Sequence, residues 1–324
     1  MTPLRLLAAD IGGTNARLAM VQAGADGRLE VGTRRHYRCA DHPSLEAIVA
    51  DFIAAAGLPD AMAIAVAGTV DAERITSRNI PWPIVLESIR ALGIAHVGAV
   101  NDFVAVAHAE QCMREQGTCL LTPAADAPAT TGPTLVVGPG TGLGAALRVP
   151  FDGGTLVLPG EPQQMALAPG NRRELAVLQQ WMDAGAGHVG YGEAISGPGL
   201  LRLYRSLCAL DGAPPRLTSS DAVSGAAGAG HDPHAVEAVE MFCGLFGSCV
   251  GDLVLATGAT RVFVAGGVPL KILRFLLDGR FARRMTHRHI MQPALERVPV
   301  RLLQDPDLGV VGAASWWRSR PGHG

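Results

Sequence analysis

The sequence contains a single lysine, Lys271, and no Gly-Lys dipeptide, so it lacks the Walker A loop that binds phosphate in many ATPases. Aromatic residues make up 5% of the chain and charged residues 17%, and the formal net charge is -2. This nearly balanced charge gives no basic face of the kind that nucleic acid requires. We therefore expect a compact enzyme with no nucleic-acid partner.

Long apolar runs and paired cysteines are missing as well. No stretch reaches the roughly 18 uninterrupted apolar residues that a membrane span needs. The N-terminal MTPLRLLAADIGG meets an acid and two glycines too early for a signal-peptide core. The six cysteines form no CxxC pair, a pattern typical of reduced thiols. The sequence thus predicts a cytoplasmic protein with no membrane partner.

Glycine, by contrast, is abundant with 40 residues, and 324 residues suffice for one large or two smaller domains. Residues 4–38 predict three strands separated by the glycine turns IGGTN and GADG. A helical pattern over 43–57, a strand over 61–68, a helix-like segment over 84–93, a strand over 96–102 and a helix from Phe103 follow. This order predicts three antiparallel strands and then alternating helices and strands.

The second half of the chain repeats this beginning. TLVVGPGTGLGAALRV (134–149) has the same strand, glycine turn and strand as LLAADIGGTNARLAM (6–20). A helical region from about 171 to 256 and the strand RVFVAGGV (261–268) come next. Two copies of one unit predict two related lobes with a ligand cleft between them. The helical run with Met241, Phe242, Leu245 and Phe246 is expected to be core or a dimer face, which leaves a homodimer open.

The glycine turn of the second copy has three interpretations. Gly140, Gly142 and Ala145 fit a dinucleotide-binding GxGxxA with Glu161 as the ribose contact, but that pattern must open a helix and strand-like sequence follows here. A plain hairpin turn or bulge is the second interpretation. In the third, both glycine turns bind phosphate oxygens through backbone N–H groups. Asp10 then holds the magnesium of a nucleotide, directly or through water.

Several segments occur in the order seen in bacterial glucokinases. They are AADIGGTNARLAM (8–20), AVNDFVAVAHA (99–109), VVGPGTGLGAAL (136–147), LPGE (158–161), GHVGYGEAISGPGLLRLYRSL (187–207), FVAGGV (263–268) and DPDLGVVGAASW (305–316). Over nearly its whole length the chain resembles the non-ROK type of the sugar kinase/actin/Hsp70 superfamily. The resemblance implies an α/β fold of two RNase H-like lobes, the actin-like ATPase/hexokinase fold, with ATP and hexose in the cleft. The small lobe would comprise 1–108 plus 307–321 and the large lobe 109–306.

The same resemblance assigns the site residues. It implies that Asp102 is the catalytic base that receives the proton of the sugar hydroxyl during phosphoryl transfer, although an aspartate before a helix also serves as an N-cap. ATP and Mg²⁺, the latter on Asp10, would be bound by Ala9, Asp10, Ile11, Gly12, Gly13, Thr14, Asn15, Gly140, Thr141, Gly142, Gly266 and Gly267. The hexose, glucose above all, would contact Asn79, Asn101, Asp102, Glu161, Gln164 and Glu193. Arg17 is expected to form an ion pair beside the first turn.

Two of the sugar contacts depart from the family pattern. After Pro-Gly-Glu the family has Gly-Gly-His, whereas this chain has Pro162-Gln163-Gln164, so Gln164 stands at the histidine position. The family glutamate five residues before the glycine of SGPG falls on Gly192 here. The nearest glutamate, Glu193, would be turned by about 100° on a helix. The sequence leaves open a weaker glucose site, a kinase for another hexose, and a paralogue that binds without turnover.

Overall fold

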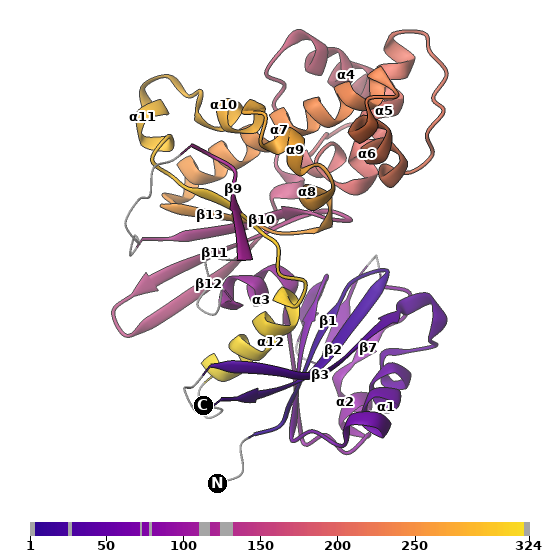
Figure 1. The fold of residues 1–324 in the computed structure, drawn as a ribbon, viewed down its shortest axis with the longest axis vertical. Coiled ribbons are helices and arrows are strands. Elements are labelled where there is room, and N and C mark those ends of the chain that lie inside the picture. Colours follow the sequence, from indigo (N-terminus) through magenta and orange to yellow (C-terminus); the bar gives the residue numbers. More distant parts are fainter. Residues whose placement is uncertain are drawn as a thin grey trace. The chain divides into compact units, whose positions relative to one another are not determined.

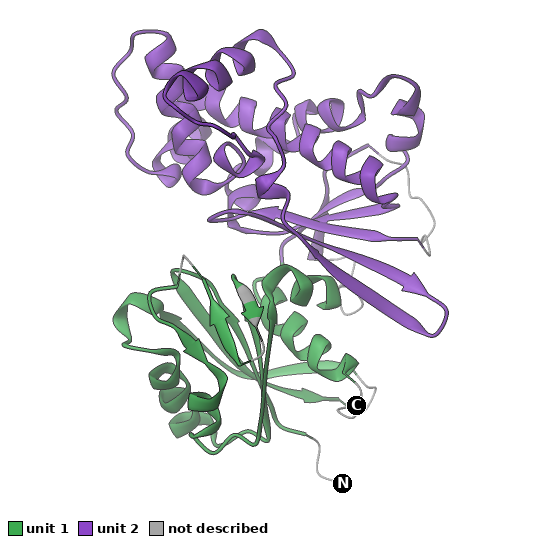
Figure 2. Ribbon diagram, turned by 180° about the vertical axis from the view of Figure 1, so that it is seen from behind, with its two compact units in different colours: residues 1–116, 305–324 green, residues 117–304 purple. Residues whose placement is uncertain are grey.

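The computed structural model describes residues 4–24, 28–71, 73–77, 80–109, 117–123 and 132–320. Asn79, one of the expected sugar contacts, lies outside the described residues. The chain divides into two compact units (Figure 2), unit 1 with residues 1–116 and 305–324 and unit 2 with residues 117–304.

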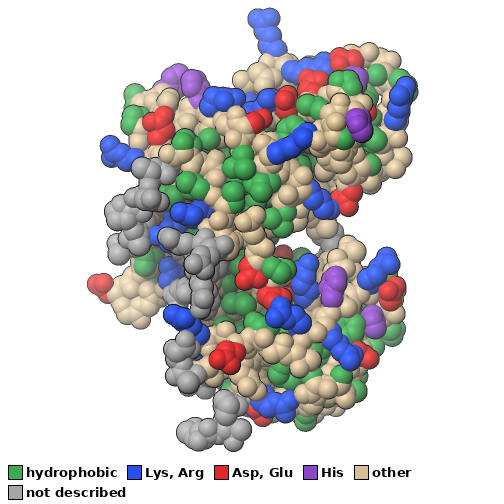
Figure 3. Space-filling view, in the orientation of Figure 1, with side chains coloured by type: hydrophobic (Ala, Val, Ile, Leu, Met, Phe, Trp, Pro, Cys, Tyr) green, Lys and Arg blue, Asp and Glu red, His purple; other side chains and the backbone are tan. Residues whose placement is uncertain are grey.

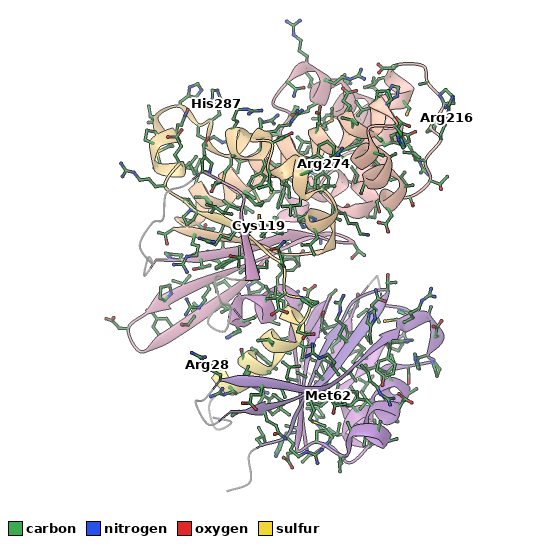
Figure 4. All side chains as sticks on the ribbon, in the orientation of Figure 1. Arg28, Met62, Cys119, Arg216, Arg274 and His287 are labelled. Carbon is green, nitrogen blue, oxygen red and sulfur yellow. The ribbon has the colours of Figure 1, made fainter. Side chains whose placement is uncertain are left out.

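Unit 1 is built on a five-stranded sheet with the order β3-β2-β1-β4-β8 (Figure 1). Its strands are β1 (Leu6–Ile11), β2 (Asn15–Ala23), β3 (Leu29–Arg38), β4 (Ala61–Val66) and β8 (His96–Asn101). The first three are antiparallel, as the sequence predicted, and β4 and β8 run parallel to β1. All six residues of β4 are buried, Met62 among them (Figure 4), as is usual for a strand covered on both faces.

Helices and a small second sheet complete unit 1. The helices are α1 (Leu45–Ala56), α2 (Leu86–Arg90), α3 (Asp102–Ala109) and α12 (Leu308–Ser319), with the 3-10 turn η1 (Cys39–Asp41). The C-terminal α12 packs against α3 and β1. The small sheet consists of β5 (Thr69–Asp71), β6 (Arg74–Thr76) and β7 (Ile84–Val85). The single helix expected over 84–93 was wrong in part, because its first two residues pair with β6 instead.

The main sheet of unit 2 has the order β12-β11-β10-β13-β14-β9. Its strands are β9 (Thr118–Leu120), β10 (Thr134–Pro139), β11 (Leu143–Phe151), β12 (Gly154–Gly160), β13 (Arg261–Val264) and β14 (Val300–Leu303). Its first five strands repeat the order and directions of the unit 1 sheet, and β9 adds an antiparallel edge strand. The internal repeat inferred from the sequence is therefore confirmed in the topology of each unit.

The region from about 171 to 256, which was expected to be helical, consists of four helices separated by turns. The unit 2 helices are α4 (Arg172–Asp183), α5 (Gly197–Leu210), α6 (Ser220–Ala229), α7 (Pro233–Thr257), α8 (Gly267–Lys271), α9 (Leu273–Leu276), α10 (Arg280–Thr286) and α11 (Gln292–Leu295). The 3-10 turns are η4 (Pro162–Gln164), η5 (Tyr191–Glu193) and η6 (His289–Met291). Serine, asparagine and aspartate N-caps begin α4 to α7, because their side chains accept the first free N–H groups.

The long helix α7 forms the core of unit 2. Among the described residues it is the one helix long and apolar enough to cross a membrane. Of its most apolar 18-residue stretch, 78% is buried inside the protein. Met241, Phe242, Leu245 and Phe246 are all buried, so they are core residues of this unit. The helix α7 is thus long and apolar because other elements of the unit surround it.

A buried ion pair joins α4 to α10 beside this core. Glu174 is 4% exposed, and both its oxygens face the Arg284 guanidinium at 2.6 and 3.1 Å. The backbone N–H of Gly170 and the side chain of Asn171 donate to the same carboxylate. The carboxylate is therefore well satisfied where water is excluded. On the molecular face shown in Figure 3, by contrast, Lys and Arg side chains are interspersed with Asp and Glu.

Candidate active site

The expected phosphate turn of unit 1 joins β1 to β2. It consists of residues 12–14, and the Gly12 N–H donates to the Asn15 carbonyl at 2.9 Å to close it. The Thr14 carbonyl accepts from the Cys39 N–H at 2.9 Å, which ties the turn to the end of β3. Backbone hydrogen bonds therefore hold this glycine turn at the carboxyl end of β1.

Asp10 lies one residue before the end of β1, facing Arg17 on β2. The Arg17 Nη1 to Asp10 Oδ2 distance is 3.1 Å, so the expected ion pair beside the turn is confirmed. The Asp10 side chain is 20% exposed. Burial raises the pKa of Asp10 above its ordinary value, while the neighbouring Arg17 acts in the opposite direction.

The first turn of α12 packs directly against Asp10. A Cβ added to Gly309 would lie 2.4 Å from Asp10 Cγ and 2.7 Å from its Oδ2. The carboxylate thus lies near the N-terminal end of a helix, where negative charge is favoured. Glycine at 309 is required by this contact, and sequence reasoning missed it because a glycine in a first helical turn carries no signal of its own.

Asn101 and Asp102 mark the junction of β8 and α3. The Asn101 Oδ1 accepts from the N–H groups of Phe103 and Val104 at 3.0 and 3.3 Å, so Asn101 caps the helix. The Asp102 Oδ1 also accepts from the Phe103 N–H, at 2.9 Å. The capping role that the sequence offered for Asp102 is therefore shared with its neighbour.

The unit 1 residues meet at one edge of one sheet. Because β1, β4 and β8 are parallel, their carboxyl ends lie at the same edge, with Ile11 paired to Val66 and Val66 paired to Asn101. Such an edge is where open α/β sheets bind ligands. The structure thus brings Asp10, the first glycine turn and the Asn101–Asp102 pair together, as the sequence led us to expect.

The corresponding turn of unit 2, residues 140–142, joins β10 to β11. Its Gly140 N–H donates to Gly142 O at 2.8 Å, and Gly140 O accepts from the Gly197 N–H at the start of α5, also at 2.8 Å. Because the turn opens a strand, the dinucleotide interpretation is excluded here. By register Gly138 occupies the place of Asp10, and a Cβ there would lie 2.1 Å from Ala265 O. This copy therefore has no room for an acidic side chain at that position.

The loop after β13 lies against the same turn. Gly266 has φ +100°, and an added Cβ would lie 2.5 Å from Pro139 O. The next glycine, Gly267, begins α8, and neither it nor Gly140 would bring an added Cβ within 4 Å of a described atom. The backbones at these two positions are thus open to approach by a ligand. At Gly138 and Gly266, by contrast, a neighbouring backbone segment packs so closely that it leaves no room for a side chain.

The expected sugar residues of unit 2 lie around the turn η4. Glu161 is exposed and accepts from Gln163 Nε2 at 2.9 Å. Gln164 is exposed too, and its backbone carbonyl is 2.8 Å from His188 Nε2. The turn η4 packs against η5, so the 161–164 and 191–193 segments are neighbours in this unit. Sequence reasoning placed Gln163 between two site residues but gave it no role.

Glu193 is engaged away from these residues. Its carboxylate pairs with Arg202 on α5, and the Arg202 guanidinium lies 4.1 Å from the ring centre of Trp181 on α4. This ion pair directs Glu193 toward the α4 and α5 helices. Gly192, one residue earlier, is the residue of η5 that faces Gln163.

Comparison with known proteins identifies the family. The glucokinase family model matches residues 7–320. A glucokinase-like protein of Xylella fastidiosa (strain Temecula1) is 40% identical over 319 residues, which cover 97% of this chain and 95% of that protein. The glucokinase of Nitrobacter hamburgensis is 32% identical over 324 residues, covering 97% of each chain.

Solved structures give the same answer for the fold. The crystal structure of a glucokinase from an Antarctic psychrotroph has a TM-score of 0.85 at 28% identity, covering 99% of this chain and 100% of that chain. A ROK family glucokinase from Streptomyces griseus has a TM-score of 0.65 at 21% identity, covering 98% and 100%. The fold is therefore the actin-like ATPase fold, whose repeated sheet each unit carries once. With the family model matched almost from end to end and full-length relatives above 30% identity, this chain belongs to the glucokinase family.

Proposed function

We propose that this protein is a glucokinase that transfers the γ-phosphoryl group of ATP to O6 of glucose and produces glucose 6-phosphate. Family membership supports the reaction class. The observation that carries the assignment of residues is the shared sheet edge of unit 1. There Asp10 lies near the end of β1, a glycine turn follows β1, and Asp102 follows β8, and these strands run parallel through β4.

In this proposal Asp102 is the general base. The Phe103 N–H holds its Oδ1 at 2.9 Å, which orients the carboxylate. The carboxylate takes the proton from O6 as that oxygen attacks the γ-phosphorus in line. Asn101, whose Oδ1 caps α3, keeps its Nδ2 amide group to donate to a sugar hydroxyl. In this arrangement the Oδ1 of Asn101 caps the helix, and the Nδ2 of the same side chain contacts the substrate.

The nucleotide would be bound mainly by backbone groups. The N–H groups of the turns at 12–15 and 140–142 would approach phosphate oxygens, and Ala9 and Ile11 would support the first turn. Gly266 and Gly267 would lie beside the adenosine. Gly140 and Gly267 support this role because neither a positive φ nor a described neighbour requires glycine at either position.

Asp10 fits a magnesium ion that is bound chiefly by the nucleotide. Among the described residues no cluster of three or more His, Cys, Asp or Glu side chains could hold a metal. Mg²⁺ at phosphate sites needs only one or two carboxylates beside phosphate and water ligands. Asp10 would hold it, and the ion when bound would neutralise phosphate charge.

Glu161, Gln164 and Glu193 would complete the sugar side, together with Asn79. Glu161 is exposed and is held by Gln163, so its remaining lone pairs can accept from sugar hydroxyls. Glu193 would have to leave Arg202 before it could reach a sugar. We therefore propose Glu161 as the principal acidic contact of the hexose.

A cytoplasmic location suits this reaction. The five cysteines that the structure describes are free thiols, four buried and one half-buried, which is typical of a reducing compartment.

The test is Mg²⁺-dependent phosphoryl transfer from ATP to glucose, mannose, fructose, N-acetylglucosamine or no sugar. Glucose should be the preferred acceptor, and Asp102→Ala should lower kcat by at least about 100-fold, the usual contribution of a general base, while ATP binding persists. Asp51→Asn changes an exposed aspartate of the same unit and serves as the control. Preference for another hexose would refute the substrate assignment, and full activity of Asp102→Ala would refute the catalytic one.

A further inference from the structure

Three glycines surround Gln163. A Cβ added to Gly190 would lie 2.3 Å from the Gln163 carbonyl oxygen, and one added to Gly192 would lie 2.9 Å from Gln163 Cβ. One added to Gly142 would lie 2.7 Å from Gln163 Oε1. None of the three glycines has a positive φ, so packing rather than backbone conformation requires them. A side chain at 192 and the side chain at 163 therefore exclude one another.

The Gln163 amide touches two parts of the candidate site. Its Nε2 donates to Glu161 Oε2 at 2.9 Å, and its Oε1 lies over Gly142 in the second glycine turn. The bond to Glu161 is charge-assisted, and it holds one carboxylate oxygen in place. The amide has a second N–H and an acceptor oxygen that can still bind a hydroxyl.

We propose that Gln163 is a specificity-determining residue for the hexose. Its side chain occupies the space that a side chain at 192 would fill. From there it positions Glu161 and offers its own amide to a sugar hydroxyl. This inference rests on the proposed function, because it takes Glu161 as a sugar contact. It places the principal sugar recognition of unit 2 in the 161–164 segment, and this part of the recognition does not require Glu193 to leave its ion pair with Arg202.

The first variant is Gln163→Met, which keeps the length and volume of the side chain and removes the amide. Loss of the amide removes its hydrogen bond to the sugar and releases Glu161, which should together raise KM for glucose about tenfold. The kcat and KM for ATP should stay nearly unchanged, and the unfolding temperature should fall no more than in the control below. If Gln163 only fills space and supports the fold, the substitution should change KM for ATP and the unfolding temperature as well. Gln179→Met is the matched control, because it breaks a similar exposed bond, from Nε2 to Asp183 Oδ1 at 2.7 Å on α4.

The second test measures the coupling between 163 and 192. Gly192→Ala should raise KM for glucose because its Cβ displaces Gln163, and this increase should disappear in a Gln163→Gly background. Gly187→Ala, where no described atom lies within 4 Å of the added Cβ, is the control. An increase of the same size in both backgrounds would overturn the inference.

The wild-type measurement separates the two proposals. If wild type phosphorylates glucose and Gln163→Met leaves KM for glucose within about twofold, the inference fails and the proposed function stands. If wild type transfers no phosphate to glucose, the proposed function fails, and calorimetric glucose binding decides the inference. Gln163→Met must then weaken Kd about tenfold, the effect expected from losing the hydrogen bond to the sugar and releasing Glu161. Unchanged or undetectable glucose binding overturns the inference.

Discussion

Gly309→Ala should disable the nucleotide site from outside the sheet. The added Cβ would lie 2.4 Å from Asp10 Cγ and 2.8 Å from Asp10 Cβ. Carbon atoms in contact lie about 3.5–4.0 Å apart, so either the aspartate or the first turn of α12 must move by roughly 1 Å. A misplacement of about 1 Å can cost about 100-fold in rate even when the mutation lies away from the reacting atoms. We expect kcat/KM for MgATP to fall by about that factor.

The free energy of unfolding should change far less than the activity. Overpacking costs about 1–3 kcal/mol, and replacing glycine by alanine in a helix returns up to about 1 kcal/mol. The net loss should be about 0–2 kcal/mol by urea unfolding. Gly225→Ala on α6 is the control, because no described atom lies within 4 Å of its added Cβ, so activity should be retained and stability should stay equal or rise.

Two results would refute this reasoning. Wild-type kcat/KM for MgATP in Gly309→Ala would show that Asp10 tolerates displacement and does not serve the nucleotide. An unfolding cost for Gly309→Ala that persists in an Asp10→Gly background would show that the strain arises elsewhere in α12.

Two further substitutions test the glycine turn and the buried ion pair. Gly140→Ala should fold like wild type, because its Cβ meets no described atom within 4 Å, yet raise KM for ATP at least about tenfold if phosphate approaches the turn closely. A wild-type KM would favour a plain hairpin turn. Glu174→Ala should destabilise unit 2 by about 3 kcal/mol in urea unfolding, since it leaves the Arg284 charge without its buried partner. Lys271→Ala, which breaks an exposed pair with Asp221, should cost less than about 1 kcal/mol, and equal losses would contradict the role of burial.

Local patterns predicted the strands around the two glycine turns correctly. Buried strands such as β4 and β10 are continuous apolar runs, and the turns that follow β1 and β10 begin with glycine, so both copies of the unit are visible in the sequence. The same patterns found a helical region over 171–256 without its division into separate helices, and they were wrong in part over 84–93. Capping residues divide the first segment into separate helices, and a short strand pairing replaces the start of a helix in the second.

The sequence by itself determined the chemistry available to the site. The absence of a Gly-Lys dipeptide excluded the Walker A loop, and the apolar runs that end near Asp10 and Asp102 placed both aspartates at strand ends. These inferences succeed because strands and turns are encoded by neighbouring residues, and parallel strands then bring their carboxyl ends to one edge.

Only the tertiary structure decided how several of these side chains are held. The contact of Gly309 with Asp10, the packing of Gln163 among Gly142, Gly190 and Gly192, and the pairing of Glu193 with Arg202 each join separate elements. Such contacts depend on which elements pack together and at what distance, which neighbouring residues do not encode. That is why the packing roles of Gln163 and Gly309 gave no signal in the sequence, although one holds the Glu161 carboxylate and the other leaves room for the Asp10 side chain.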